Sequence, residues 1–367
     1  MSFLWETFMR RAMFRMEAEP AHELGMKALR SGFAAPFYAD ARSFGIGPVR
    51  RFGLEFANPV GIAAGFDKNA VAVNQLASLG FGFVEVGTVT LKPQTGNPKP
   101  RMFRLPDDEA LINRLGFNNE GAEAVAKRLA SLERKCVVGV NIGKNKSVPN
   151  DEATENYLAA FRLLQPQADY VAVNISSPNT PNLRDLQKSE NLDELLGVLQ
   201  DANWQTSGQR DTDRSSATRP KPLLVKIAPD LSEAEIEAAV NVCRKHDVSG
   251  IIATNTTIGR NGLRTANVES IGTGGLSGRP LTSRSTAVVS TIYKYSNGKL
   301  PVIGVGGVFD AWDAFEKIAA GASLVQAYTG FIYSGPTFAR EVNEGLAKIL
   351  KERGFSSVDE AVGSGLR

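Results

Sequence analysis

The chain has 367 residues, 43% of them hydrophobic and 22% charged, and a formal net charge of +3. These proportions exclude a disordered or fibrous protein, and the near-balanced charge argues against a nucleic-acid binder. The chain has only two cysteines, Cys136 and Cys243, and two histidines, His22 and His246. They exclude a disulfide framework and the common zinc motifs, and neither histidine lies in a segment typical of a Ser-His-Asp hydrolase. We therefore expect no metal site and a reducing compartment.

The first 40 residues predict a helical subdomain, ahead of a catalytic domain over residues 41–367. Apolar residues recur at helical spacing from Trp5 to Met16, and Pro20 can open a second helix that continues to Phe33. Apolar faces flanked by arginines are typical of helices that lie on a membrane, although a hairpin packed on the main domain explains the same pattern. No stretch approaches the roughly 20 apolar residues of a membrane span, and the start of the chain makes a poor signal peptide.

After a linker over residues 35–51, continuous apolar runs alternate with amphipathic segments. Such runs predict strands buried on both faces of a parallel sheet. The predicted strands are 59–63, 82–86, 137–142, 170–174, 222–227, 250–254, 301–305 and 322–327. The predicted helices are 119–132, 152–164, 191–202, 232–244, 282–295 and 311–319. This order predicts an α/β fold, a (β/α)8 TIM barrel with an N-terminal two-helix extension.

A doubly wound open sheet is the alternative fold, but it calls for a GxGxxG turn that residues 61–65 do not provide. Two β-rich insertions into the barrel are expected, near residues 91–105 and 260–275. The polar segment 206–220 contains few apolar residues and is expected to be a solvated loop.

Polar side chains gather at the carboxyl ends of the predicted strands, where barrel enzymes build their active sites. Asn141 and Asn174 end two strands, Asn255 follows another, and Lys68 and Lys226 belong to the same end of the barrel. One asparagine at a strand end is usually a turn or a cap. A set of such groups costs stability if unpaired, so we expect a polar ligand to satisfy them.

Two features narrow the ligand. The glycines of segment 304–307, with Tyr328 and Thr329 after the last strand, have the placement of the phosphate site common in these barrels. Asparagine carboxamides offer paired donors and acceptors that match the amide edges of a pyrimidine or a flavin ring. A lysine beside them supplies positive charge for a carboxylate or a reduced flavin.

Long motifs in the same order resemble the dihydroorotate dehydrogenases, and among them the membrane-associated, quinone-reducing class 2. The resemblance covers residues 1–355 or so. It is carried by NPVGIAAGFDK (58–68), GFGFVEVGTVT (80–90), PQTGNPKPRMFRL (93–105), NRLGFNN (113–119), NIGKNK (141–146), NISSPNTPNLRDLQ (174–187), TNTT (254–257), GGLSG (274–278) and IGVGG (303–307). The cytosolic class resembles the barrel too, but it generally has a cysteine where this chain has Ser177, and it lacks the N-terminal extension.

The resemblance implies an FMN cofactor and a dihydroorotate or orotate site. The implied FMN-binding residues are Ala64, Gly65, Phe66, Asp67, Lys68, Thr88, Asn141, Asn174, Lys226, Thr254, Gly278, Gly307, Tyr328 and Thr329. The implied substrate-binding residues are Lys68, Asn113, Arg114, Leu115, Gly116, Phe117, Asn174, Asn179, Asn255 and Thr256. In this interpretation Lys68 pairs with the orotate carboxylate and the asparagines bond the ring amides.

The resemblance makes Ser177 the base that takes the C5 proton while the C6 hydride passes to flavin N5. An unassisted serine is a weak base, so it needs a relay or a dry, oriented site. Phe117 could exclude water and Thr180 could offer a proton path. Without the resemblance, a turn hydroxyl before Pro178 is the simpler reading.

By the same resemblance, the N-terminal helices admit a membrane quinone, with His22 and Arg104 at the entrance. Alternatively, both are ordinary surface residues. The expected location is peripheral, on the cytoplasmic face of a bacterial inner membrane. The expected function is quinone-linked oxidation of dihydroorotate for pyrimidine synthesis. The alternatives are an FMN barrel oxidoreductase with another acid substrate and a catalytically inactive barrel that senses flavin or orotate.

Overall fold

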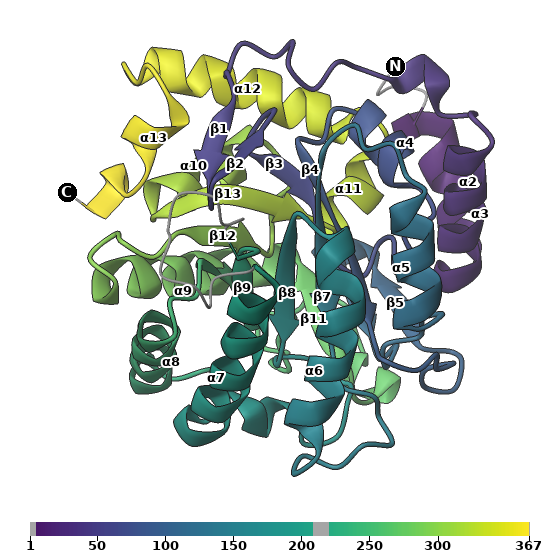
Figure 1. Cartoon of the computed structure of the whole chain (residues 1–367). Helices are drawn as coiled ribbons and strands as arrows, with labels where there is room; N and C mark the ends of the chain where they lie inside the picture. Colours follow the sequence, from purple (N-terminus) through teal and green to yellow (C-terminus); the bar gives the residue numbers. More distant parts are fainter. Residues whose placement is uncertain (1–4, 208–219, 367) are drawn as a thin grey trace.

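Eight parallel strands close into a barrel in the computed structural model, which describes residues 5–207 and 220–366 (Figure 1). Neighbours around the barrel follow chain order. The strands are β3 (Val60–Ile62), β4 (Phe83–Val89), β7 (Val137–Ile142), β8 (Tyr170–Asn174), β9 (Leu223–Ile227), β10 (Gly250–Ala253), β12 (Val302–Val305) and β13 (Ala322–Ala327). The predicted (β/α)8 barrel is confirmed, and the open sheet is wrong because β13, the last barrel strand, hydrogen-bonds to β3, the first, and closes the ring.

Helices cover the outside of the barrel (Figure 1). They are α4 (Val73–Ser78), α5 (Ala122–Ala130), α6 (Ala153–Leu164), α7 (Ser189–Thr206), α8 (Glu233–Lys245), α9 (Thr282–Tyr295), α10 (Ala311–Ala319), α11 (Thr329–Ser334), α12 (Phe338–Glu352) and α13 (Val358–Ala361). Local chemistry sets where they begin: Ser232 and Glu235 form a capping box at α8, and the Asp310 carboxylate caps α10. The predicted solvated loop falls largely on residues 208–219, outside the described residues.

The barrel interior holds a carboxylate among apolar side chains. Glu85 has no exposed surface, and its two oxygens accept hydrogen bonds from Asn141 Nδ2 at 2.9 Å, Tyr170 OH at 3.0 Å and Gln326 Nε2 at 2.8 Å. The Lys226 ammonium lies 3.8 Å from Glu85 Oε1. Buried charges are stable only when they are paired and hydrogen-bonded in this way.

Three antiparallel strands form a small sheet beside the barrel: β5 (Met102–Leu105), β6 (Ala110–Asn113) and β11 (Gly275–Gly278). β5 falls within the first predicted insertion, and β11 begins where the second ends. The sequence analysis missed β6, and most of segment 260–275 is irregular. A local core that includes Ile112 and Leu276 holds this sheet together.

The predicted linker is more ordered than expected. After a 3-10 turn, η2 (Ala35–Phe37), β1 (Val49–Arg51) pairs with β2 (Leu54–Phe56) in a short hairpin. Its two turn residues, Phe52 and Gly53, both have positive φ, the geometry that suits a two-residue hairpin turn. A phenylalanine in that position gives no turn signal, which explains the missed strands.

The N-terminal segment is helical, as predicted: η1 (Trp5–Met9) is a π-helical turn, followed by α2 (Arg10–Arg15) and α3 (Ala18–Arg30). These elements lie at one side of the barrel, where α3 contacts α4 and β5 (Figure 1). Within the described residues, no helix is both long and apolar enough to cross a membrane.

Two sets of contacts attach the N-terminal helices to the barrel. The Arg101 guanidinium donates to both carboxylate oxygens of Glu19, at 2.7 and 3.0 Å, and both side chains are largely buried. Trp5 Nε1 donates to the backbone carbonyl of Tyr333 on α11 at 3.0 Å, while the Tyr333 hydroxyl donates to Leu105 O and Ala110 O of the small sheet.

We predict that Glu19→Gln destabilises the N-terminal attachment by about 3 kcal/mol, because it leaves the Arg101 charge buried without its partner. Thermal unfolding and proteolysis of the N-terminal segment measure the loss. Glu55→Gln is the control, because Glu55 pairs with Arg50 at an exposed site and its change should cost under about 0.5 kcal/mol. Equal effects of the two variants would contradict a stabilising role for the buried pair.

The same pair should make the attachment sensitive to acid. Burial alone would raise the pKa of Glu19, but the hydrogen bond and charge of Arg101, aided by Lys99, hold it below its ordinary value. A lowered pKa means stability that is present above the unfolded pKa of about 4.3 and is lost as pH falls through the folded pKa. Proteolysis of the N-terminal segment should therefore accelerate below about pH 4, and a flat profile would contradict this assignment.

Candidate active site

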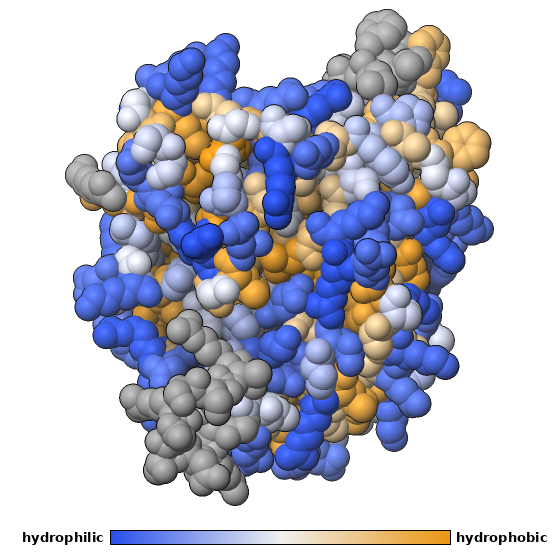
Figure 2. Space-filling view, turned by 45° about the horizontal axis from the view of Figure 1, so that its top comes forward, coloured by the Kyte–Doolittle hydropathy of each residue, from blue (hydrophilic) through white to orange (hydrophobic). Residues whose placement is uncertain are grey.

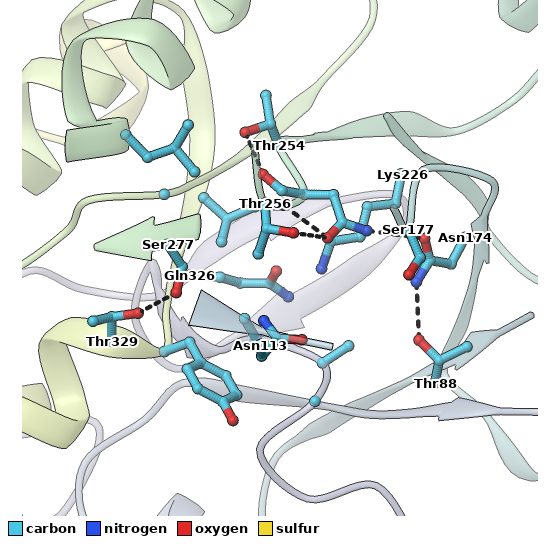
Figure 3. A pocket seen from close by; sticks show the side chains of 18 of the residues that line it. Thr88, Asn113, Asn174, Ser177, Lys226, Thr254, Thr256, Ser277, Gln326 and Thr329 are labelled. Atoms are coloured by element: carbon cyan, nitrogen blue, oxygen red, sulfur yellow. Dashed lines mark hydrogen bonds between the residues drawn. The ribbon is translucent and has the colours of Figure 1, made fainter. Parts of the chain in front are cut away.

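A cavity of about 140 Å³ opens at the carboxyl ends of the barrel strands (Figure 3). It brings together most of the residues singled out from the sequence. These are Ala64, Gly65, Lys68, Thr88, Asn113, Leu115, Gly116, Phe117, Asn174, Ser177, Asn179, Lys226, Thr254, Asn255, Thr256, Gly278, Gly307, Tyr328 and Thr329. Asn174, Ser177 and Lys226 lie on one side of the cavity, and Ser277 and Thr329 on the other (Figure 3).

Four of the residues implied to bind FMN or substrate lie outside this lining. The Asp67 carboxylate accepts from the backbone N–H groups of Val71 and Ala72, so it shapes the loop that carries Lys68. The Arg114 guanidinium stacks on a phenylalanine ring and donates to carbonyls of the second insertion. Phe66 lines two neighbouring cavities, and Asn141 sits one layer behind the wall.

A chain of hydrogen bonds connects the barrel interior to the polar wall. From Asn141, which is bound to Glu85, it passes through the Thr88 hydroxyl at 2.5 Å to Asn174 Nδ2 at 2.9 Å (Figure 3). Asn174 Oδ1 then accepts from Asn255 Nδ2 at 3.1 Å. The orientations of these carboxamides are thus fixed by other protein groups before any ligand binds.

Ser177 lies in the loop after β8, with 5% of its surface exposed. Its hydroxyl oxygen accepts from the backbone N–H of Asn179 at 3.2 Å, as a turn hydroxyl does. The same hydroxyl lines the cavity. The turn therefore holds the oxygen in place, and the two readings of Ser177 are compatible. Thr180 is the residue that the sequence analysis named for a proton path. Its Oγ1 atom is buried and has no hydrogen-bond partner among the described residues.

Two lysines line the cavity: Lys226 is buried and Lys68 is partly exposed. Burial lowers the pKa of Lys226, and the nearby Glu85 carboxylate opposes this change. Burial also lowers the pKa of Lys68, to about 8, against the attraction of Glu19. Lys68 is therefore mostly charged at neutral pH and poised to pair with an anion, because it makes no hydrogen bond or close ion pair among the described residues.

A glycine loop after β12 fits a phosphate. The carbonyls of Gly306 and Gly307 accept from the hydroxyls of Ser285 and Thr282 on α9, at 2.9 and 3.0 Å. Their N–H groups donate to no other described residue, and both glycines line the cavity. Positive φ values of 117° and 70° allow this arrangement, and a Cβ on Gly307 would meet Thr282 Oγ1 at 2.0 Å. Free backbone donors in a cavity suit an anion.

Sequence reasoning missed three polar residues of this region. Glu85 and Gln326 stand alone in apolar runs, so no spacing signals them. Gln326 lines the cavity, and its Oε1 atom is buried without a partner among the described residues, which leaves an acceptor for a ligand N–H. Ser277 shares a hydrogen bond of 2.9 Å with Thr329 (Figure 3). The sequence analysis included Ser277 in the GGLSG motif but did not predict a role for it.

An apolar cavity of about 330 Å³ lies between the N-terminal helices and the barrel. His22 and Arg104 both line it. Burial and the Lys68 charge lower the pKa of His22 to about 3, so its ring is neutral at physiological pH. The Arg104 guanidinium lies over the Phe14 ring at 4.7 Å. Apolar side chains gather on the surface over these helices, at the upper right of Figure 2.

Comparisons with known proteins agree with this geometry. The family model of dihydroorotate dehydrogenase matches residues 48–350. The dihydroorotate dehydrogenase (quinone) of Gloeobacter violaceus is 48% identical over 360 residues, 96% of each chain. That of a Roseiflexus species is 49% identical over 358 residues, again 96% of each chain. The crystal structure of the Eimeria tenella enzyme with ferulenol covers 95% of this chain and 96% of its own, with a TM-score of 0.86 and 42% identity. The chain is thus an oxidoreductase that belongs to the dihydroorotate dehydrogenase family.

Proposed function

We propose that this protein oxidises (S)-dihydroorotate to orotate in pyrimidine biosynthesis, with FMN as hydride acceptor and a membrane quinone as final electron acceptor. The observation that carries the proposal is the pairing of two different cavities. One is polar and lies at the carboxyl ends of the strands, and the other is apolar and lies under the N-terminal helices. Phe66 lines the apolar cavity, and its ring packs at 5.8 Å from Tyr328, which lines the polar one.

Fixed carboxamides support a cyclic amide as substrate. Asn174 and Asn255 are held by the hydrogen bonds described above, and Asn179 Nδ2 donates to Asn113 Oδ1 at 3.1 Å. Such a set can bond both the N–H and the C=O groups of a dihydropyrimidine ring. Lys68 adds the positive charge that the carboxylate of dihydroorotate requires.

The free N–H groups of Gly306 and Gly307 would hold the FMN phosphate, and Lys226 and Gln326 would face its ring. When bound, FMN supplies an acceptor for the substrate hydride. Lys226 favours negative charge on the reduced ring by Coulomb attraction. Ser177 Oγ would take the C5 proton while its own hydroxyl proton passes to a relay, for which Thr180 is the candidate. The N–H of Asn179 would set the orientation of the serine. Phe117, 9% exposed, helps to exclude water from the serine.

The apolar cavity would admit the quinone from the membrane surface. Its walls are almost entirely hydrocarbon, with the neutral ring of His22 and the guanidinium of Arg104 as polar exceptions. The exposed apolar residues Phe8, Met9 and Phe33 fit peripheral contact with lipid. We propose the cytoplasmic face of a bacterial inner membrane as the location.

The decisive experiment is an anaerobic titration of the flavin-loaded protein with L-dihydroorotate, followed by quinone and, separately, fumarate or NAD. The expected result is bleaching of the flavin by dihydroorotate and recovery with quinone alone. Bleaching with recovery by fumarate or NAD would contradict the quinone role. Absence of bleaching would favour an FMN oxidoreductase for another acid, or a sensor that binds orotate without turnover.

Replacing Ser177 by Ala should slow reduction of the flavin by dihydroorotate by roughly 100-fold or more, the usual contribution of a general base. FMN content should not change. Stopped-flow spectroscopy of the bleaching step measures the rate. Ser177→Cys is the matched control, because a thiol still offers a proton acceptor and should restore part of the rate. Reduction of Ser177→Ala at the wild-type rate would rule out Ser177 as the base.

Orotate binding should weaken as pH rises through about 8, because the Lys68 pKa is lowered to about 8 and only the ammonium form pairs with the carboxylate. Above that pH the dissociation constant should rise by up to about tenfold per pH unit. Orotate titrations followed by the flavin spectrum measure it. Lys68→Met should bind orotate weakly and with no pH dependence in this range. A retained dependence would assign it to another group.

Filling the apolar cavity should separate the two half-reactions. Ala28→Trp on α3 should slow flavin reoxidation by quinone roughly tenfold, which corresponds to about 1.4 kcal/mol. Bleaching by dihydroorotate should be unaffected. Lys27→Trp is the control, because the neighbouring Lys27 does not line this cavity. If both variants reoxidise at the wild-type rate, quinone reaches the flavin by another path.

A further inference from the structure

Lys317 on α10 is a buried cation that the proposed reaction does not use. Its side chain has no exposed surface, and its Nζ donates to Ser285 Oγ at 2.6 Å and to Thr286 Oγ1 at 3.0 Å. Within residues 5–207 and 220–366, it forms no ion pair with a carboxylate. Asp313, one turn earlier on the helix, directs its carboxylate to Phe309 N at 2.8 Å instead.

This arrangement gives the ammonium group of Lys317 hydrogen-bond acceptors, but no negatively charged partner. A buried charge without a counter-ion is costly. Burial accordingly lowers the pKa of Lys317 to about 7, against the weaker attraction of Asp313 and Glu316. A negative group bound nearby would favour the charged form of Lys317.

The part of the polar cavity nearest to Lys317 is the glycine loop after β12. Ser285 Oγ, which accepts from Lys317, lies 2.9 Å from the carbonyl oxygen of Gly306 and 3.0 Å from that of Thr282, so its one proton is shared between these two acceptors. The aliphatic part of Lys317 packs against Gly304, where an added Cβ would meet its Cδ at 3.3 Å. Lys317 is therefore one hydroxyl away from the loop whose two glycines line the cavity.

We propose that Lys317 is a positioning residue for an anionic phosphate held at the Gly306–Gly307 turn. By donating to the Ser285 oxygen, it polarises the hydroxyl that fixes the Gly306 carbonyl, so the turn keeps its N–H groups directed into the cavity. Its charge also favours a dianion over a neutral group at this place. The inference rests on the proposed function, because FMN supplies the phosphate.

The test compares two flavins that differ only in the phosphate. Full-length wild-type protein and Lys317→Met, both freed of flavin, are titrated with FMN and with riboflavin, and binding is followed by flavin fluorescence. The expected result is a loss of FMN affinity of about tenfold or more, with riboflavin affinity nearly unchanged. A purely structural role would weaken both flavins equally. An equal loss, or no loss, would overturn the proposal.

Lys144→Met is the matched control, because Lys144 is also buried, at 2% exposed, and donates to the Val148 carbonyl away from the loop. It should keep the wild-type preference for FMN. If Lys317→Met does not fold, Ser285→Ala tests the same path and should also lose FMN affinity selectively. An unchanged preference in Ser285→Ala would overturn the proposal. A wild-type protein that does not prefer FMN to riboflavin would instead refute the proposed cofactor.

Discussion

The enclosed carboxylate of Glu85 is the constraint on which the rest of the structure depends. A charge at the centre of a barrel must be paired from several directions at once. Asn141, Tyr170, Lys226 and Gln326 supply those partners from β7, β8, β9 and β13. A slip of one residue in any of these parallel strands would turn its partner out of the interior. The carboxylate therefore specifies the register of half the barrel as well as the composition of its centre.

The two ends of the polar cavity are ordered by different means. The carboxamide side takes its orientation from Glu85 through Asn141 and Thr88, so side chains on neighbouring strands determine it. The glycine side takes its shape from backbone carbonyls that bond to hydroxyls of α9, outside the barrel. A ligand with an amide ring at one end and an anion at the other would match this division.

The sequence predicts the barrel well because buried parallel strands leave continuous apolar runs that few other folds produce. It predicts the cavity because polar residues at strand ends converge in a barrel whatever the details of packing. It does not predict β6, because this short strand depends on a partner distant in the chain, as Leu276 pairs with Ile112. It does not predict the β1–β2 hairpin, because Phe52 in the turn gives no turn signal. The roles of Glu85 and Gln326 are not predicted for a related reason. The role of a single polar residue in an apolar run can be inferred only when its neighbours across the barrel are known. The roles assigned to the individual site residues stay predictions.

The short helix α11 belongs to both cavities. Its first residue, Thr329, lines the polar cavity and bonds to Ser277, while Tyr333 near its other end receives Trp5 from the N-terminal segment and bonds to the small sheet. The helix has only six residues, so contacts at its two ends lie within two turns of each other. By thermodynamic reciprocity, any coupling between the two ends acts equally in both directions. The barrel cavity and the packing of the N-terminal helices therefore meet at one short helix.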